Sequence, residues 1–352
     1  MTALGALIRS RIAQTGPITI ADYMGECLMH PTHGYYATRD PLGAAGDFIT
    51  APEISQMFGE LIGLALAQCW QDQGAPERIV LAELGPGRGT LMADALRATR
   101  GVPGFHESLS VHFVETSPVL REAQADAVPD ATWHDRVDTL PPGPLFLIAN
   151  EFFDALPIRQ FIRDGDAWRE RMVGLDGDAL QIGLSAPAPL TLVEHRLADT
   201  EDGDLVELCP TLPGMISTLS GRIEAEGGAA IIIDYGDWQS LGDTWQALSG
   251  HKKTDPLAAP GEADLTAHVD FAEIARHVDP AKYSRLTTQG VFLERLGITP
   301  RAQALAKSLT GDALQTHIKA HRRLTHPAEM GELFKVLSIY PATAMPPPGL
   351  EP

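Results

Sequence analysis

A glycine-rich turn near residue 85 constrains the fold of this chain more than any other stretch. The apolar run 79–82 leads into Glu83-Leu84-Gly85-Pro86-Gly87-Arg88-Gly89, and the segment 90–96 that follows has the composition of a helix. Glycines let the backbone adopt positive φ angles and leave room for a ligand against the main chain. The first turn of the next helix would point its unpaired N–H groups at that ligand. The pattern predicts a strand, a ligand-binding turn and a helix, as in α/β nucleotide-binding sheets.

Two residues of this turn distinguish between nucleotide-like ligands. A dinucleotide-binding turn has a third Gly or Ala three places after the second, and that position here is Thr90. Glu83 stands in an otherwise apolar strand, and a carboxylate is a poor neighbour for a pyrophosphate but a good one for a cation. S-adenosylmethionine carries a sulfonium and an amino group and no phosphate. Glu83, Gly85, Gly87 and Gly89 are therefore predicted to bind S-adenosylmethionine, and an NAD-dependent oxidoreductase is disfavoured.

Acidic residues follow the next two predicted strands. The strand 109–115 ends in Glu115, which is placed to accept hydrogen bonds from both hydroxyls of a ribose. A short strand is predicted at 132–135, where Asp135 is a candidate contact for the adenine amino group. A solvated strand-end acid is the structural alternative for Glu115. The strand–turn–helix unit that precedes Glu115 favours the ribose.

The buried strand 144–149 is followed by a polar loop, Asn150-Glu151-Phe152-Phe153-Asp154-Ala155-Leu156-Pro157. In open α/β sheets ligands bind at the carboxyl ends of the strands, so this loop should face the same crevice as the glycine-rich turn. An amide and two carboxylates among aromatic side chains are costly to bury without partners. The loop also resembles the one by which many N-methyltransferases hold a planar nitrogen. Asn150, Glu151 and Asp154 are thus candidate catalytic residues, with a purely structural turn as the alternative.

The segment before the glycine-rich turn is predicted to be a helical extension that covers the substrate. Leu4, Leu7, Ile8 and Ile12 share one helical face, which indicates a docked first helix. Thr19 followed by Asp22 predicts the capped start of a second helix. The extension continues to about residue 76.

A glycine-flanked turn then leads into a long apolar helix at about 54–73. In the structural interpretation, Thr50 is the helix N-cap, Pro52 opens the helix and Glu53 interacts favourably with its dipole. In the functional interpretation, the turn folds over the cofactor, presents the carboxylates of Asp47 and Glu53 to it, and makes Thr50 a candidate cofactor-binding residue. Both interpretations stay open.

The C-terminal half predicts two insertions and the end of the sheet. An inserted β-ribbon and, at 185–204, a polar linker occupy 158–204, and a turn-rich lid or substrate-binding segment occupies 237–267. The remaining predictions are helices at 211–226, 271–277, 292–296 and 301–324, strands at 158–163, 168–175, 180–184, 229–236, 284–288 and 333–340, and a frayed tail at 346–352.

Composition argues against several classes of partner. The formal charge is −19, from 27 Lys and Arg against 46 Asp and Glu, which disfavours nucleic acid and favours a basic protein partner.

Cys27, Cys69 and Cys209 lie far apart and indicate reduced thiols of a cytosolic protein. No metal is expected at His30 and His33, which lack a neighbouring Cys or carboxylate. No apolar run approaches the ~18–20 residues of a membrane span, and without a clear targeting segment the cytoplasm is the expected location.

Taken together and in order, these stretches resemble the MidA family, class I S-adenosylmethionine-dependent methyltransferases related to a mitochondrial complex I assembly factor. The resemblance implies an α/β sheet of order 3-2-1-4-5-7-6 with an antiparallel final strand. With the chain order described above, we expect a helical extension at 1–76 and a cofactor-binding domain at 77–352 with insertions at about 158–204 and 237–267. The matching stretches are 46–55, 83–91, 114–118, 150–157, 234–236, 260–271 and 330–336.

The resemblance also implies an activity. S-adenosylmethionine would bind at Gly85, Gly87, Gly89 and Glu115 and leave as S-adenosylhomocysteine, with a protein arginine as methyl acceptor and a respiratory complex I subunit as the implied target. A second copy of the chain, as a homodimer, is a further candidate partner. One departure concerns the acceptor, because Gln246-Ala247-Leu248-Ser249 precedes Gly250-His251 where the family has an arginine element.

Arginine is protonated at any working pH and is weakly nucleophilic. Paired carboxylates can hold its planar fork, aim one nitrogen at the methyl group and accept a proton. Glu151 is the first candidate for this role and Asp154 the second, with Asp47 or Glu53 closing from the N-terminal side. The alternative of another class is an assembly chaperone that binds S-adenosylmethionine and docks on a partner without methylating it.

Overall fold

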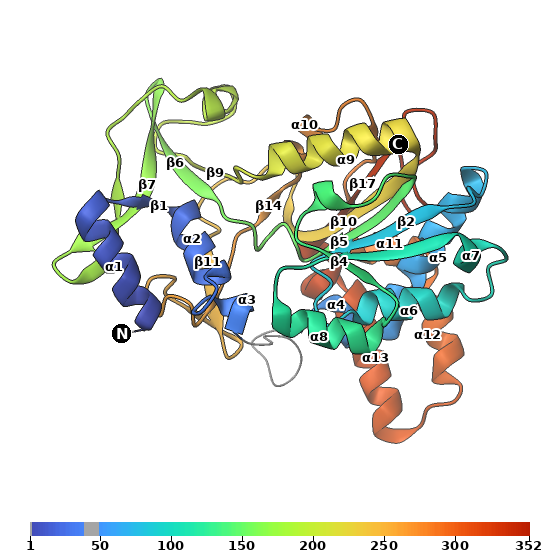
Figure 1. Ribbon diagram of the computed structural model, residues 1–352. Coiled ribbons are helices and arrows are strands. Elements are labelled where there is room, and N and C mark those ends of the chain that lie inside the picture. Colours follow the sequence, from blue (N-terminus) through green and yellow to red (C-terminus); the bar gives the residue numbers. More distant parts are fainter. Residues whose placement is uncertain (1, 39–48) are drawn as a thin grey trace.

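The computed structural model describes residues 2–38 and 49–352, and a twisted, mostly parallel sheet forms its larger lobe (Figure 1). The strands lie in the order β4-β3-β2-β5-β10-β17-β15, and β17 runs antiparallel to both neighbours. Renumbered within the sheet, this is 3-2-1-4-5-7-6, so the predicted fold class is confirmed. The strands are β2 (Ile79–Leu84), β3 (Leu109–Val114), β4 (Thr132–His134), β5 (Leu145–Asn150), β10 (Gly228–Asp237), β15 (Lys282–Tyr283) and β17 (Phe334–Tyr340), with β14 (Val269–Asp270) beside β10 and β16 (Thr287–Thr288) beside β17.

Helices cover both faces of this sheet. Ile79 and Leu81 point into one core and Val80 and Ala82 into the other, which explains why the central strands are continuously apolar. In Figure 1, α9 and α10 lie on one side of the sheet and α6 and α8 on the other. The helices of this lobe are α5 (Gln56–Asp72), α6 (Thr90–Thr99), α7 (Phe105–Ser108), α8 (Pro118–Ala127), α9 (Leu212–Glu226), α10 (Phe271–Arg276), α11 (Gln289–Arg295), α12 (Ile298–Ala306) and α13 (Gly311–Thr325), with short turns at η1 (Val137–Thr139) and η3 (Pro327–Gly331).

A smaller lobe joins the first helices to both insertions, on the left of Figure 1. Its core brings Ile8 and Tyr23 from the N-terminal helices against Val173 and Leu265 from the insertions. Two small sheets build it, one in the order β1-β7-β6-β9 with β8 beside β7, the other in the order β12-β11-β13. The elements are α1 (Ala3–Thr15), β1 (Ile18–Thr19), α2 (Ile20–Met29), α3 (Tyr35–Thr38), β6 (Arg159–Asp164), β7 (Ala167–Asp176), β8 (Ala179–Leu184), η2 (Thr191–Ala198), β9 (Leu205–Leu208), β11 (Gln246–Ser249), β12 (Lys252–Thr254) and β13 (Asp264–Thr266).

The N-terminal expectations are met with one exception. The Thr19 hydroxyl accepts from the backbone N–H of Asp22, and the Asp22 carboxylate accepts from that of Thr19, which is the predicted capping box. Leu4, Ile8 and Ile12 are buried. Leu7 is 51% exposed, so its prediction was wrong, because it lies at the edge of the buried stripe.

Three further expectations need correction. The apolar helix begins at Gln56, because extended Ser55 separates it from the short helix α4 (Ala51–Ile54). The helix predicted at 301–324 is two helices, α12 and α13. The tail is docked rather than frayed, since Leu350 is buried and the Arg285 backbone N–H donates to the Glu351 carbonyl.

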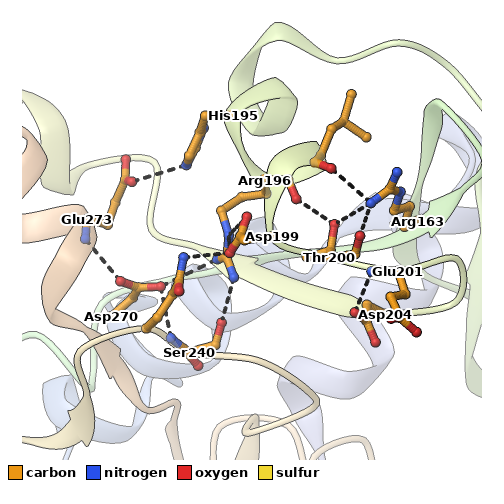
Figure 2. A network of polar contacts seen from close by, with 12 residues as sticks. Arg163, His195, Arg196, Asp199, Thr200, Glu201, Asp204, Ser240, Asp270 and Glu273 are labelled. Atoms are coloured by element: carbon orange, nitrogen blue, oxygen red, sulfur yellow. Dashed lines mark hydrogen bonds and ion pairs between the residues drawn. The ribbon is translucent and has the colours of Figure 1, made fainter.

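A buried arginine ties the two lobes together (Figure 2). Arg196 of η2 is 6% exposed; it donates to the Asp199 carboxylate at 3.0 Å and to the Ser240 carbonyl at 3.2 Å. It also pairs with Asp270 at 3.5 Å, and Asp270 caps the N-terminus of α10. The expected linker at 185–204 is therefore structured and anchored to the larger lobe. Within the described ranges, no helix is long and apolar enough to cross a bilayer.

Candidate active site

A cavity of about 1240 Å³ opens at the carboxyl ends of the central strands. The ends of β2, β3, β5 and β10 line one side of it. Gln246, Lys253 and Asp264 of the smaller lobe line it too. The lining includes eight carboxylic acids and two cationic side chains, Arg136 and Lys253. The cavity is therefore suited to a ligand that carries positive charge.

The glycine-rich turn forms one wall of this cavity. Gly85, Gly87 and Gly89 have φ angles of +57°, +55° and +79°, and Gly89 is the N-cap of α6. A Cβ atom at Gly85 would lie 2.9 Å from the ring of Phe152. Both the positive φ angles and this close approach explain the need for glycine. Gly85 and Gly87 line the cavity, whereas Gly89 is not among its described lining residues, and the contact of these glycines with the cofactor stays a prediction.

Glu83 lies beneath this turn and is 3% exposed. The Met92 backbone N–H hydrogen-bonds to its carboxyl group, whereas Oε2 has no partner among the described atoms. Burial raises the pKa of Glu83 well above its usual range. A buried, unsatisfied oxygen of this kind is costly unless a ligand supplies a donor or a positive charge.

The two acids predicted to contact a nucleoside both line the cavity. Glu115 Oε1 accepts from the backbone N–H groups of Thr116 and Ser117, at 2.8 and 2.7 Å. Its Oε2 accepts from the Gln124 amide at 3.3 Å. The Asp135 side chain is 77% exposed and pairs with Arg121 at 2.6 Å, so its contact with adenine stays a prediction.

The loop after β5 brings Asn150, Glu151 and Asp154 to the same cavity. Glu151 has a φ angle of +51°, which is rare for a residue with a side chain and is often found at functional sites. Its Oε1 accepts from the Ala51 backbone N–H and the Asn150 amide, both at 3.1 Å. Asp234 of β10 fixes the loop, because its Oδ2 accepts from the backbone N–H groups of three consecutive loop residues, 152–154.

Burial changes the titration of this pair. It raises the pKa of Glu151 to about 7, and the nearby Asp154 carboxylate adds to that shift. It raises the pKa of Asp154 to about 6, opposed by a hydrogen bond from the Tyr235 hydroxyl. Both pKa values fall back when a cation binds, because a nearby positive charge favours the ionised form. The pair is thus arranged to gain charge when a cationic ligand enters.

Two of the N-terminal candidates, Thr50 and Glu53, also line the cavity. Thr50 lines the cavity and is the N-cap of α4, but its side chain makes no capping bond. Glu53 accepts a hydrogen bond from the Thr90 hydroxyl at 2.5 Å and pairs with Arg88 at 3.8 Å. Asp47 lies outside the described residues. Glu53 therefore joins the N-terminal segment to the turn, and its catalytic role stays a prediction.

Sequence reasoning did not identify several cavity residues, among them Tyr36, Tyr235, Asp264 and His268. Tyr235 and Asp264 lie in stretches that were singled out, a polar strand tip and a family-like segment. Nothing in their spacing placed them at the same cavity, because Tyr235 reaches it through the pairing of β10 with β5 and Asp264 through the packing of the smaller lobe. No group of three or more metal-binding side chains occurs in the part of the chain that the structure describes.

Comparisons with known proteins agree on one family. Residues 61–289 match the family model of S-adenosyl-L-methionine-dependent methyltransferases. The chain is 38% identical to the Xenopus laevis protein arginine methyltransferase NDUFAF7, mitochondrial, over 96% of this chain and 86% of that one. It is also 38% identical to the Homo sapiens protein of the same name, over 94% and 82%.

Two solved structures from Burkholderia thailandensis share the whole fold. One, bound to S-adenosyl-homocysteine, has a TM-score of 0.82 and 28% identity, and covers 99% of this chain and 94% of that one. The second, a native structure, has a TM-score of 0.78 and 30% identity, with coverage of 96% and 91%.

Proposed function

The chain belongs to the MidA family of S-adenosylmethionine-dependent methyltransferases, and on that premise we propose that it methylates a guanidinium nitrogen of a protein arginine. The relatives named as protein arginine methyltransferases are similar over at least 94% of this chain. The cavity lining has an excess of carboxylic acids, which suits a cationic acceptor.

The residues at the glycine-rich turn fit the cofactor. S-adenosylmethionine supplies an electrophilic methyl group when bound. Glu83, with its unpartnered Oε2, would hold the amino group, and Glu115 would hold the ribose hydroxyls. Gly85 and Gly87 leave the main chain open to the cofactor.

One observation carries the choice of acceptor. Three buried oxygens on the cavity wall lack a hydrogen-bond donor within the described residues: Glu83 Oε2, Asn150 Oδ1 and Asp154 Oδ1. All three accept hydrogen bonds, so the missing ligands are donors. The amino group of the cofactor would donate a hydrogen bond to Glu83 Oε2. The other two belong to the loop after β5, where a guanidinium with five N–H donors meets the requirement.

In this proposal, Glu151 and Asp154 do three things. Their carboxylates bind the protonated guanidinium, aim one nitrogen and neutralise its charge. The nitrogen that gains a methyl group must release a proton, and Glu151 accepts it. Binding of the protonated guanidinium favours the ionised form of Glu151, so Glu151 is charged and able to accept that proton.

The finer identity of the acceptor is also a proposal. The resemblance to an assembly-factor family suggests a subunit of respiratory complex I as the target. The net charge of −19 favours a basic segment of that protein. The vertebrate relatives are named mitochondrial, and cytoplasmic location of this chain stays a prediction.

The test combines cofactor binding with methyl transfer. We expect S-adenosylhomocysteine to bind in the micromolar range by calorimetry, and label from radioactive S-adenosylmethionine to appear on arginine residues of lysate proteins. Glu151→Gln should retain binding and lower transfer by about 10²–10⁴-fold. Glu122→Gln, at an exposed position on α8, is the control and should behave as wild type.

Either of two results would contradict the proposal. Labelling of residues other than arginine would refute the acceptor. Wild-type turnover by Glu151→Gln would refute the catalytic role. Cofactor binding with no labelled protein would instead favour the assembly chaperone.

A further inference from the structure

We propose that Asp264, from the smaller lobe, is a specificity-determining residue that supplies the third carboxylate around the acceptor guanidinium. The inference rests on the proposed function and extends it. Glu151 and Asp154 belong to the sheet lobe, so the acceptor would be bound by both lobes at once. The selection of arginine would then depend on carboxylates that the two lobes place around one guanidinium.

The backbone places Asp264 beside the catalytic loop. Asp264 opens β13, is 5% exposed and lines the cavity. Three residues later, the Ala267 backbone N–H donates to the Asp154 carbonyl at 3.0 Å. The end of β13 is thus joined to the loop that carries Glu151. The strand keeps this position because Leu265 is buried in the core of the smaller lobe.

Tyr36 holds the Asp264 carboxylate in place. Its hydroxyl donates to Asp264 Oδ1 at 2.8 Å, and its backbone carbonyl accepts from the Ser117 hydroxyl at 2.6 Å. Ser117 also donates its backbone N–H to Glu115. Tyr36 therefore fixes Asp264 relative to the predicted ribose site. Burial and the carboxylates of Asp264 and Asp154 raise the pKa of Tyr36, so the hydroxyl remains a neutral donor.

An unsatisfied atom shows that this corner of the cavity needs a ligand. Asp154 is 6% exposed, lines the cavity, and its Oδ1 has no partner among the described residues. A guanidinium presents donors along more than one edge of a plane, whereas an ammonium is a compact point charge. Carboxylates that converge from two lobes match the first geometry better. Asp264 would thus favour arginine over lysine.

The test separates the charge of Asp264 from its hydrogen bond. Asp264→Asn keeps an oxygen that accepts from Tyr36 and removes the charge. Tyr36→Phe removes the hydrogen bond and keeps the charge. Asp178→Asn, in the exposed turn between β7 and β8, makes the same change in net charge away from the cavity. The probe is an array of peptides with one central arginine in varied contexts, with lysine and citrulline counterparts. Binding is measured in the presence of S-adenosylhomocysteine, and KM and kcat are measured with S-adenosylmethionine.

We expect Asp264→Asn to weaken arginine-peptide binding and raise KM about tenfold or more, with kcat and S-adenosylhomocysteine affinity nearly unchanged. Tyr36→Phe should lose less arginine-peptide affinity than Asp264→Asn does, and Asp178→Asn should lose none. Wild-type affinity in Asp264→Asn, or equal losses in Asp264→Asn and Tyr36→Phe, would overturn the inference. If the wild type bound S-adenosylhomocysteine but no arginine peptide, the proposed function itself would fail, and the inference with it.

Discussion

At the scale of single residues, the sequence predicted where Glu151 lies but not how its backbone and side chain are held. Its position after a buried strand predicted a polar group at the ligand edge, and the structure brings it to the cavity with Asp154. The φ angle of +51° and the Ala51 N–H bond could not be predicted, since the bond depends on a segment a hundred residues away and Asp234 of β10 holds the loop backbone. Asp264 was missed for the same reason. Residues that contact only through tertiary structure leave no local pattern.

The raised pKa values at this loop predict the pH dependence of the activity. Acceptor binding needs ionised carboxylates, so kcat/KM should rise with pH across the range in which Glu151 and Asp154 titrate, from about 6 to about 7. Below that range it should fall about tenfold per pH unit for each proton that must leave. Arg323 acts on Glu151 in the opposite direction, as it favours ionisation. Initial rates on the labelled acceptor from pH 5 to 8 measure this, and a flat profile would contradict it.

The raised pKa of Glu151 also affects the stability of the acceptor-free protein, which should fall as pH rises, whereas the activity should increase. The unfolded chain releases the Glu151 proton near its ordinary pKa of 4.5, whereas the folded protein holds it up to about 7. The folded state therefore binds more protons between these values, and its stability falls as pH rises through them. Glu151→Gln should remove this loss, which urea unfolding at pH 5 and pH 8 can measure. An equal pH effect in both proteins would refute the assignment.

At the scale of elements, long apolar runs were predictable and short pairings were not. The central strands β2, β5 and β10 are buried on both faces, so their sequence is apolar up to the polar residues at their carboxyl ends. Strands β9, β11 and β13 have three or four residues and pair with distant segments. So few residues do not establish a periodicity. The insertion expected as a lid is thus a small sheet, and all three of its strands contribute residues to the cavity.

The glycine-rich turn gives the prediction that belongs to this scale. Gly85→Ala places a Cβ atom 2.9 Å from Phe152 at a φ of +57°, where a side chain costs about 1–2 kcal/mol. We expect S-adenosylhomocysteine affinity to fall about tenfold. Gly101→Ala is the matched control, because its Cβ would enter open space. Calorimetry measures the S-adenosylhomocysteine affinity of both variants, and equal affinities would show that the turn does not hold the cofactor.

At the scale of the whole molecule, the cavity is formed where the two lobes meet. The sheet lobe carries the glycine-rich turn and the loop after β5, whereas Tyr36 and Asp264 come from the smaller lobe. Acceptor binding then depends on how firmly the lobes are held together. The Arg196 cluster in Figure 2 is one of these connections.

Arg196→Met tests this dependence. The variant keeps much of the apolar volume but leaves the Asp270 carboxylate, 13% exposed, without its arginine. Loss of one partner from a buried ion pair costs about 3 kcal/mol or more, so we expect a lower melting temperature. Hydrogen exchange should accelerate in η2 and β9 and stay slow in β2 and β5. Arg322→Met is the control, because Arg322 is 58% exposed on α13 and pairs only at the surface.

Ligand affinities of Arg196→Met distinguish a weakened contact between the two lobes from unfolding of the whole protein. S-adenosylhomocysteine affinity should be preserved in Arg196→Met, since Glu83 and the glycine-rich turn belong to the sheet lobe. KM for the acceptor should rise, because Asp264 and Tyr36 move with the smaller lobe. Parallel losses of cofactor and acceptor affinity would instead show that the lobes unfold as one unit, and the two-lobe account of acceptor binding would then be wrong.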